Sequence, residues 1–248
     1  MNIDIYDDNI RLSATLDMPE GAGEKCPLVI VIHGFTGYSE ERHITAVSQT
    51  FNELGHATLR VDMYGHGKSE GSFYQHTLFK WMTNAMTVID YARGLPFVTD
   101  IWLCGHSQGG LTVMLAAGLK HEFIRGLIPL SPAVMIPEMA RKGELLGSSF
   151  DPNAVPEELV SPEGWKLSGN YIRAAQMIHA EDAIARFHGP VLLVHSDTDE
   201  VVPFSCSAEA EQAYDNAELV VIPGDTHCYD FHLDLVLDAI RQWMPRGK

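Results

Sequence analysis

The serine in the segment GHSQG, residues 105–109, is the side chain best placed for covalent chemistry. The segment matches G-x-S-x-G, follows the apolar run IWLC and precedes a helical pattern. A strand, a sharp turn that carries the serine and a helix are the context of a nucleophile elbow. Small residues at Gly105 and Gly109 permit the bend, and the helix N-terminus favours negative charge beside the serine. The sequence therefore predicts that Ser107 is a nucleophile that attacks a carbonyl carbon.

A serine hydroxyl is a poor nucleophile until a neutral imidazole accepts its proton and a carboxylate orients that imidazole. We predict His227 as this base, because it follows the strand-like LVVI, at a strand end where the sites of α/β sheets gather. The segment HSDTDEVVP offers Asp197 and Asp199 as the carboxylate. Asp197 suits a turn cap, so Asp199 is the favoured partner. The order Ser–Asp–His agrees with the α/β-hydrolases.

An oxyanion hole is predicted where the segment HGFTG, residues 33–37, leaves the buried run PLVIVI. Backbone N–H groups after an early strand and directly after the nucleophile commonly hold the substrate oxygen. Here those donors are Phe35 and Gln108, and Gly34 permits the close approach of the backbone. His33 and His106 flank these motifs and suit supporting roles, whereas His43 lies in a helical pattern and suits the surface or packing.

No metal or organic cofactor is expected from the sequence. The segment GHGKSEG lacks the first glycine of a phosphate loop, since Asp62 occupies that position. No His, Cys or carboxylate cluster has metal-ligand spacing along the chain. The four cysteines are scattered and indicate neither a disulfide framework nor a zinc site.

The elements that must position these residues alternate between short β-rich runs and longer helical patterns, which indicates a parallel α/β sheet. We predict an α/β-hydrolase fold with a mostly parallel eight-stranded sheet, helices on both faces and an inserted helical cap. Residues 1–130 and 189–248 form the predicted core. Residues 131–188 lack a strong strand and form the predicted cap, because so long a structureless loop is unusual. The predicted strands are 3–6, 12–16, 27–33, 57–61, 101–104, 126–130, 191–195 and 219–222, and the predicted helices are 40–54, 78–93, 108–119, 205–214 and 233–244.

The amino-acid composition and net charge limit the classes of partner that the protein is expected to bind. Hydrophobic residues make up 46% and charged residues 20% of 248 residues, which is typical of a globular protein. The formal net charge of −16 argues against nucleic acid and anionic membrane partners. The N-terminus shows no signal peptide pattern and no apolar run is long enough to span a bilayer, so a cytoplasmic location is expected. The sequence leaves the oligomeric state open, a homodimer included.

Five motifs in order, HGFTG, RVDMYGHGKSEG, GHSQGG, HSDTDEVVP and GDTHCY, resemble those of the bacterial feruloyl (cinnamoyl) esterases of the α/β-hydrolase superfamily. The resemblance covers nearly the whole chain. It implies the triad Ser107, Asp199 and His227, and hydrolysis of small-molecule esters with an aromatic acyl group, such as ferulate or p-coumarate. It also implies a cap that holds the phenolic ring. The candidate substrate contacts are His33, Glu138 as the cap carboxylate, Trp165 as a stacking ring and Tyr171 near the phenol hydroxyl.

Two other functions fit the same sequence. A monoacylglycerol lipase or general short-chain carboxylesterase would use the same triad with a different acyl pocket. A non-catalytic ligand-binding protein would keep the scaffold without the chemistry. Decay of that kind usually removes a triad member, and all three candidates are present.

Overall fold

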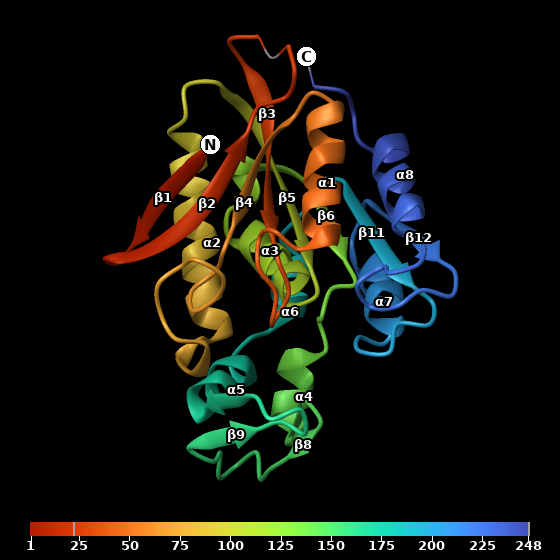
Figure 1. Ribbon diagram of the computed structural model, residues 1–248. Coiled ribbons are helices and arrows are strands. Elements are labelled where there is room, and N and C mark those ends of the chain that lie inside the picture. The colour runs from red at the N-terminus through yellow and green to blue at the C-terminus, as the bar shows by residue number, and fades with distance from the viewer. Residues whose placement is uncertain (22, 248) are drawn as a thin grey trace.

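Eight strands form the central sheet of the computed structural model, which describes residues 1–21 and 23–247 (Figure 1). The strand order is β1-β2-β4-β3-β5-β6-β11-β12. The pairs β1–β2 and β2–β4 are antiparallel, and the other neighbours are parallel. The strands are β1 (Asn2–Asp7), β2 (Ile10–Asp17), β3 (Cys26–Ile32), β4 (Ala57–Val61), β5 (Val98–His106), β6 (Ile124–Leu130), β11 (Val191–Ser196) and β12 (Ala217–Ile222). Every predicted strand is present, and the predicted fold class is confirmed.

The sheet is covered on both faces, which explains the continuous apolar runs of its middle strands. All seven residues of β3 are buried. Side chains of α1 (Arg42–Glu53) and α8 (Leu233–Trp243) pack on one face. Side chains of α2 (Leu78–Arg93), α3 (Gln108–Leu119) and α7 (Ser205–Ala213) pack on the other. Strands buried on both faces need no polar alternation, as is usual for parallel sheets.

Most of the insertion between β6 and β11 lies beyond one end of the sheet, at the bottom of Figure 1. The sequence predicts a helical cap, but the structure shows short helices mixed with two small antiparallel ribbons. The last helix of the insertion packs on α3, where Gly118 has no side chain to clash with Ala183. The elements are α4 (Ile136–Lys142), β7 (Glu144–Leu145), β8 (Ser148–Ser149), β9 (Glu158–Val160), β10 (Lys166–Ser168), α5 (Gly169–Gln176) and α6 (Ala180–Ile184).

Two short 3₁₀ helices complete the described elements, η1 (Phe73–Gln75) before α2 and η2 (His121–Phe123) before β6. None of the helices in the described residues is both long enough and apolar enough to cross a membrane.

Candidate active site

Ser107 occupies a strained turn between β5 and α3. Its backbone has φ 56° and ψ −120°, outside the regions that L-residues prefer. Such strain persists only where the surroundings enforce it. A Cβ on Gly105 would lie 2.3 Å from the Gly109 carbonyl oxygen, and a Cβ on Gly109 would lie 2.3 Å from that of His33. The two glycines of the motif therefore have steric reasons to be glycine, and the turn is the predicted elbow.

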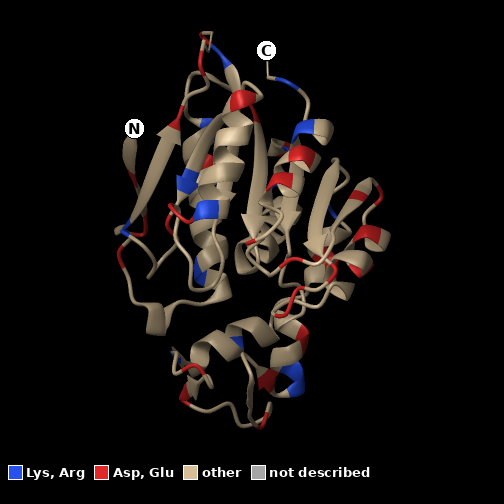
Figure 2. Ribbon diagram, turned by 45° about the vertical axis from the view of Figure 1, so that its right-hand side comes forward, with Lys and Arg blue, Asp and Glu red and all other residues tan. Residues whose placement is uncertain are grey.

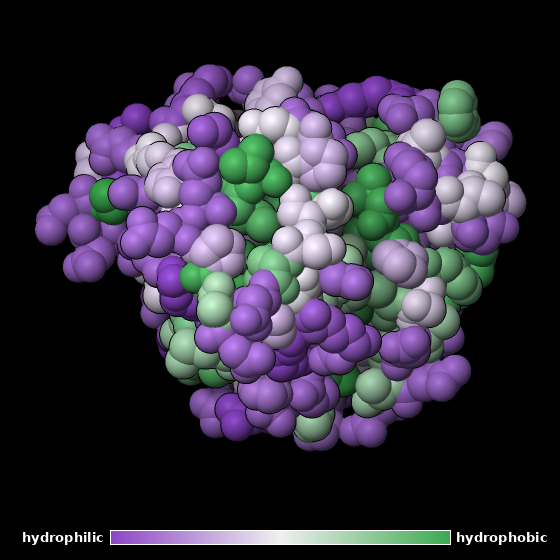
Figure 3. Space-filling view, turned by 90° about the horizontal axis from the view of Figure 1, so that it is seen from below, coloured by the Kyte–Doolittle hydropathy of each residue, from purple (hydrophilic) through white to green (hydrophobic). Residues whose placement is uncertain are grey.

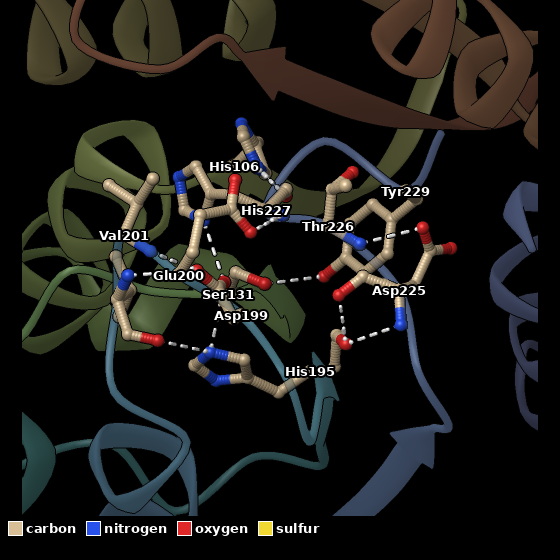
Figure 4. Close-up of polar contacts among 12 residues, drawn as sticks. His106, Ser131, His195, Asp199, Glu200, Val201, Asp225, Thr226, His227 and Tyr229 are labelled. Atoms are coloured by element: carbon tan, nitrogen blue, oxygen red, sulfur yellow. Dashed lines mark hydrogen bonds and ion pairs between the residues drawn. The ribbon is translucent and has the colours of Figure 1, made fainter. Parts of the chain in front are cut away.

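Asp199 and His227 meet across two loops at the carboxyl edge of the sheet. Asp199 follows β11 and His227 follows β12, which are parallel neighbours. The His227 Nδ1–H donates to Asp199 Oδ2 at 2.7 Å (Figure 4). The alternative carboxylate, Asp197, accepts instead from the Gly224 N–H at 2.7 Å and caps the turn. The structure thus brings the favoured carboxylate to the histidine.

The Asp199 carboxylate is fully buried and well supplied with donors. Its Oδ1 accepts from the N–H groups of Val201 and Val202, each at 2.8 Å. Its Oδ2 lies 3.2 Å from His195 Nε2 in addition to the His227 contact. Burial opposes ionisation of this carboxyl, but the hydrogen bonds from His195 and His227 outweigh it and hold the pKa of Asp199 well below its usual range. Asp199 is therefore ionised at neutral pH.

His227 has one ring nitrogen left for chemistry. Its backbone N–H donates to Glu200 Oε2 at 3.2 Å, and its carbonyl accepts from His106 Nε2 at 2.9 Å. With Nδ1 bound to Asp199, only Nε2 has no hydrogen-bond partner among residues 1–21 and 23–247. The Ser107 hydroxyl likewise has none among the described residues, and both residues line one cavity. Catalytic contacts of this kind often tighten only around a bound substrate.

The predicted oxyanion donors, Phe35 and Gln108, also line this cavity. Within the described part of the chain, neither backbone N–H is paired with another residue. The Gly34 carbonyl, in the same peptide unit as the Phe35 N–H, accepts from His33 Nδ1 at 2.7 Å and from the Gly37 N–H at 3.1 Å. These two bonds fix the plane of that peptide and leave its N–H available to a ligand.

The cavity has a volume of about 650 Å³, within the range of small-molecule sites. Apolar side chains of the cap form much of its wall, and the loops after the strands supply the polar groups. Seen from the cap end, the surface shows apolar patches among hydrophilic side chains (Figure 3). The apolar lining includes Met135, Ile136, Met139, Leu145, Leu146, Trp165, Val201, Val202 and Pro203, and the acidic lining comprises Glu41, Glu163 and Glu200.

Of the four predicted substrate contacts, only Trp165 lines the cavity. Its ring lies edge-on to Phe35 with centroids 5.6 Å apart. Tyr171 is fully buried outside the lining, and its hydroxyl donates to Gln108 Oε1 at 2.5 Å. Glu138 also lies outside the lining, because it pairs with Arg141 and Lys142 on the exposed side of α4.

His33 is likewise absent from the cavity wall. It is completely buried, donates to Gly34 and accepts from the Met63 N–H at 3.0 Å. Both ring nitrogens are therefore occupied, and burial lowers the pKa of His33 to about 3, so the ring is neutral. Its position suits support of the Phe35 amide and not contact with a substrate.

Several site residues escaped the sequence analysis. His195 sits at the end of β11, four residues before Asp199, and its Nδ1 accepts from Ser207 Oγ at 2.7 Å. Tyr229 donates to the Val194 carbonyl and bonds the Ser131 hydroxyl, which anchors the loop that carries His227 (Figure 4). The signal that could have pointed to His195 is its polar side chain in an otherwise apolar strand. The apolar cap residues carried no signal, because their types are those of any core.

The fold also assembles donors that are far apart in sequence. The ligand atoms of His43, His106 and Cys228 lie within 4.8 Å of one another, the one group of possible metal ligands found among the described residues. Its two imidazoles already bond each other, with His43 Nε2 3.2 Å from His106 Nδ1. Burial raises the pKa of the Cys228 thiol to about 11, which disfavours the thiolate that a metal would need.

The chain matches a known hydrolase family over more than half of its length. The model of a hydrolase family described as serine aminopeptidase, S33, matches residues 23–170. This chain belongs to that family. A solved structure of Est1E from Butyrivibrio proteoclasticus with bound ferulic acid is 60% identical, covers 98% of this chain and 97% of its own, and superposes with a TM-score of 0.96. These findings confirm the α/β-hydrolase fold and the predicted resemblance.

The chain is also similar, at lower identity, to a thioesterase and to a lipase. Human mitochondrial palmitoyl-protein thioesterase ABHD10 is 26% identical over 210 residues, which is 80% of this chain and 65% of that protein. The chain thus spans about two thirds of the length of that relative. Monoacylglycerol lipase of Mycolicibacterium smegmatis is 25% identical over 88% of this chain and 87% of its own length.

Proposed function

We propose that this protein is a serine esterase that releases hydroxycinnamic acids from their esters. The observation that carries the proposal is the hydrogen bond from buried Asp199 to His227, which lines one cavity with Ser107, Phe35 and Gln108. Est1E, which binds ferulic acid in its solved structure, supports the aromatic acyl group. The partner is therefore a small-molecule ester.

The mechanism follows from the free atoms of the site. Ser107 Oγ attacks the ester carbon while His227 Nε2 takes its proton, and Asp199 stabilises the imidazolium that forms. The Phe35 and Gln108 amides hold the oxyanion. The alcohol leaves with the proton from His227, and water then hydrolyses the acyl-enzyme by the same steps. Every step uses side chains and amides of this chain.

The proposal is tested by comparing kcat/KM for methyl ferulate, methyl p-coumarate, monoacylglycerols and short p-nitrophenyl esters. We expect the hydroxycinnamates to be strongly preferred. Ser107→Ala should abolish turnover, and Asp199→Asn should lower kcat by about 10⁴-fold, as loss of the orienting carboxylate does elsewhere. Asp197→Asn is the matched control and should keep near-parental kcat. Turnover retained in purified Ser107→Ala would overturn the assignment.

A monoacylglycerol lipase is the second candidate. The apolar cap wall, with Met135, Met139, Leu145 and Leu146, suits an acyl chain as well as a ring. The similarity to monoacylglycerol lipases points the same way. A preference for monoacylglycerols over hydroxycinnamates in the comparison above would select this alternative.

A cytoplasmic location stays a prediction, which fractionation of expressing cells tests.

A further inference from the structure

Two largely buried imidazoles lie beside the loop that carries His227, and each also forms part of the cavity wall. His43, on α1, places its Nε2 3.2 Å from His106 Nδ1. His106, at the end of β5, places its Nε2 2.9 Å from the backbone carbonyl oxygen of His227. The exposed fractions of His43 and His106 are 4% and 3%. The rings are also in contact in this order: His43 lies edge-on to His106 with centroids 4.4 Å apart, and His106 is tilted against His227 with centroids 4.5 Å apart.

The partners fix where the protons are. A carbonyl oxygen only accepts, so His106 Nε2 must carry a hydrogen and donate to His227. A neutral imidazole has one N–H, so His106 Nδ1 is bare and accepts from His43 Nε2–H. The direction of both bonds therefore runs from His43 through His106 to the backbone of His227.

Both rings are neutral at working pH. Burial, with the nearby His43 and His227, lowers the pKa of His106 well below its usual range. Burial also lowers the pKa of His43 to about 4, with His227 and Arg42 acting in the same direction and Asp230 opposing them. Asp199 is the remaining charged group that acts on His106, and it opposes the shift. Neutral rings leave the positive charge of the reaction to His227 alone.

We infer that His43 and His106 are positioning residues, which hold the backbone of His227 so that its Nε2 faces Ser107. The inference rests on the proposed function of Ser107 and His227. Asp199 fixes the ring of His227 at Nδ1, and Glu200 fixes its N–H. The imidazole chain fixes the other polar atom of its backbone, the carbonyl oxygen. A packing role alone would not explain the two successive hydrogen bonds made by His43 and His106. Apolar side chains could fill the same space and would bury no polar nitrogen that needs a partner.

The matched variants are His43→Gln and His43→Leu. The Gln amide can still donate to His106 Nδ1, whereas Leu fills the space and leaves that nitrogen unpaired in the interior. Since misplacing a reacting group by about 1 Å can cost about 10²-fold in rate, we expect His43→Leu to lower kcat about 10- to 100-fold. KM should stay within about threefold, because His43 is only 4% exposed at the cavity wall and Leu fills its place. His43→Gln should restore kcat to within about threefold of the parent.

Rates are normalised to the concentration of active sites from an acyl-enzyme burst, so that partial unfolding does not imitate the effect. A second readout needs no turnover. The proton resonance of His227 Nδ1–H, in its bond to Asp199, should be sharp in the parent and in His43→Gln and broadened by exchange in His43→Leu. If no ester is hydrolysed by the parent, the proposed function fails while this readout still tests the positioning role.

Two results would overturn the inference. One is parental kcat and a sharp resonance in His43→Leu. The other is an equal loss of kcat in His43→Gln and His43→Leu, which would show that the shape of the side chain matters and its N–H does not.

Discussion

The peptide between Gly34 and Phe35 owes its orientation to a buried histidine. His33 Nδ1 and the Gly37 N–H both donate to the Gly34 carbonyl, and the Met63 N–H holds the other side of the ring. Rotation of this peptide would turn the Phe35 N–H away from the cavity and break both bonds. His33 therefore supports the amide that we propose as an oxyanion donor, and it lies outside the cavity lining.

Replacing His33 by Leu should remove this support. We expect kcat to fall by about 10²- to 10³-fold, the usual cost of losing one oxyanion donor, with KM little changed. His33→Asn keeps an N–H near the position of Nδ1 and should retain part of the rate. Steady-state kinetics on methyl ferulate give both parameters. A large rise in KM with unchanged kcat in His33→Leu would instead support the predicted substrate contact.

Residues with distinctive chemistry could be predicted from the sequence, and their neighbours could not. Asp199 and His227 each follow a strand, so their meeting follows from strand order. Tyr171 has the expected place in the cap sequence, but the packing of α5 turns its hydroxyl to Gln108. Glu138 is drawn to Arg141 and Lys142 one turn away on its own helix. Such choices depend on which face of a short helix is buried, and the cap has too few residues per element to show this by periodicity.

At the scale of elements, every predicted core strand and helix is present because apolar periodicity and glycine boundaries are strong in α/β cores. The limits of α2 and α3 agree with the prediction to the residue. The small ribbons of the cap have only two or three residues per strand, too few for an alternating pattern. The elbow joins β5 to α3 only because no side chain intervenes at residues 105 and 109.

Gly109→Ala tests this junction. The new Cβ would lie 2.3 Å from the His33 carbonyl oxygen and 2.4 Å from that of Ile32, both rigid backbone atoms. Overpacking typically costs about 1–3 kcal/mol, so we expect at least that loss in the free energy of unfolding by urea. Gly23→Ala, whose Cβ would meet only one atom at 4.0 Å, is the control and should be near neutral. Equal stability of the two variants would contradict the packing argument.

At the scale of the whole molecule, buried neutral histidines make the free energy of unfolding depend on pH. Burial lowers the pKa of His33 and His76 to about 3 and that of His43 and His56 to about 4. The unfolded chain, with a His pKa of about 6.5, binds protons that the folded chain does not, so stability falls as pH drops below that value.

Each such histidine should cost up to about 1.4 kcal/mol per pH unit between about pH 6.5 and pH 4. Urea unfolding at intervals of pH measures the slope. His56→Gln should lower the slope by close to one proton, since His56 is 1% exposed and lies apart from the cavity lining. A stability that is flat from pH 7 to pH 5 would refute the argument.

The acidic surface also bears on which esters can enter. The net charge is −16, and acidic residues follow the loops between the sheet and the cap (Figure 2). Glu41, Glu163 and Glu200 line the cavity, and no Lys or Arg of the described residues does so. An ester whose alcohol carries a carboxylate must therefore approach against a negative field, which salt screens.

We expect feruloyl quinate to have a lower kcat/KM than methyl ferulate at low salt. Raising the ionic strength from about 0.01 M to about 0.15 M, which shortens the screening length from about 30 Å to about 8 Å, should raise kcat/KM for the quinate ester several-fold and leave methyl ferulate within about twofold. Glu163→Gln should reduce this salt dependence, and an equal response of both esters to salt would show that the field does not select among them.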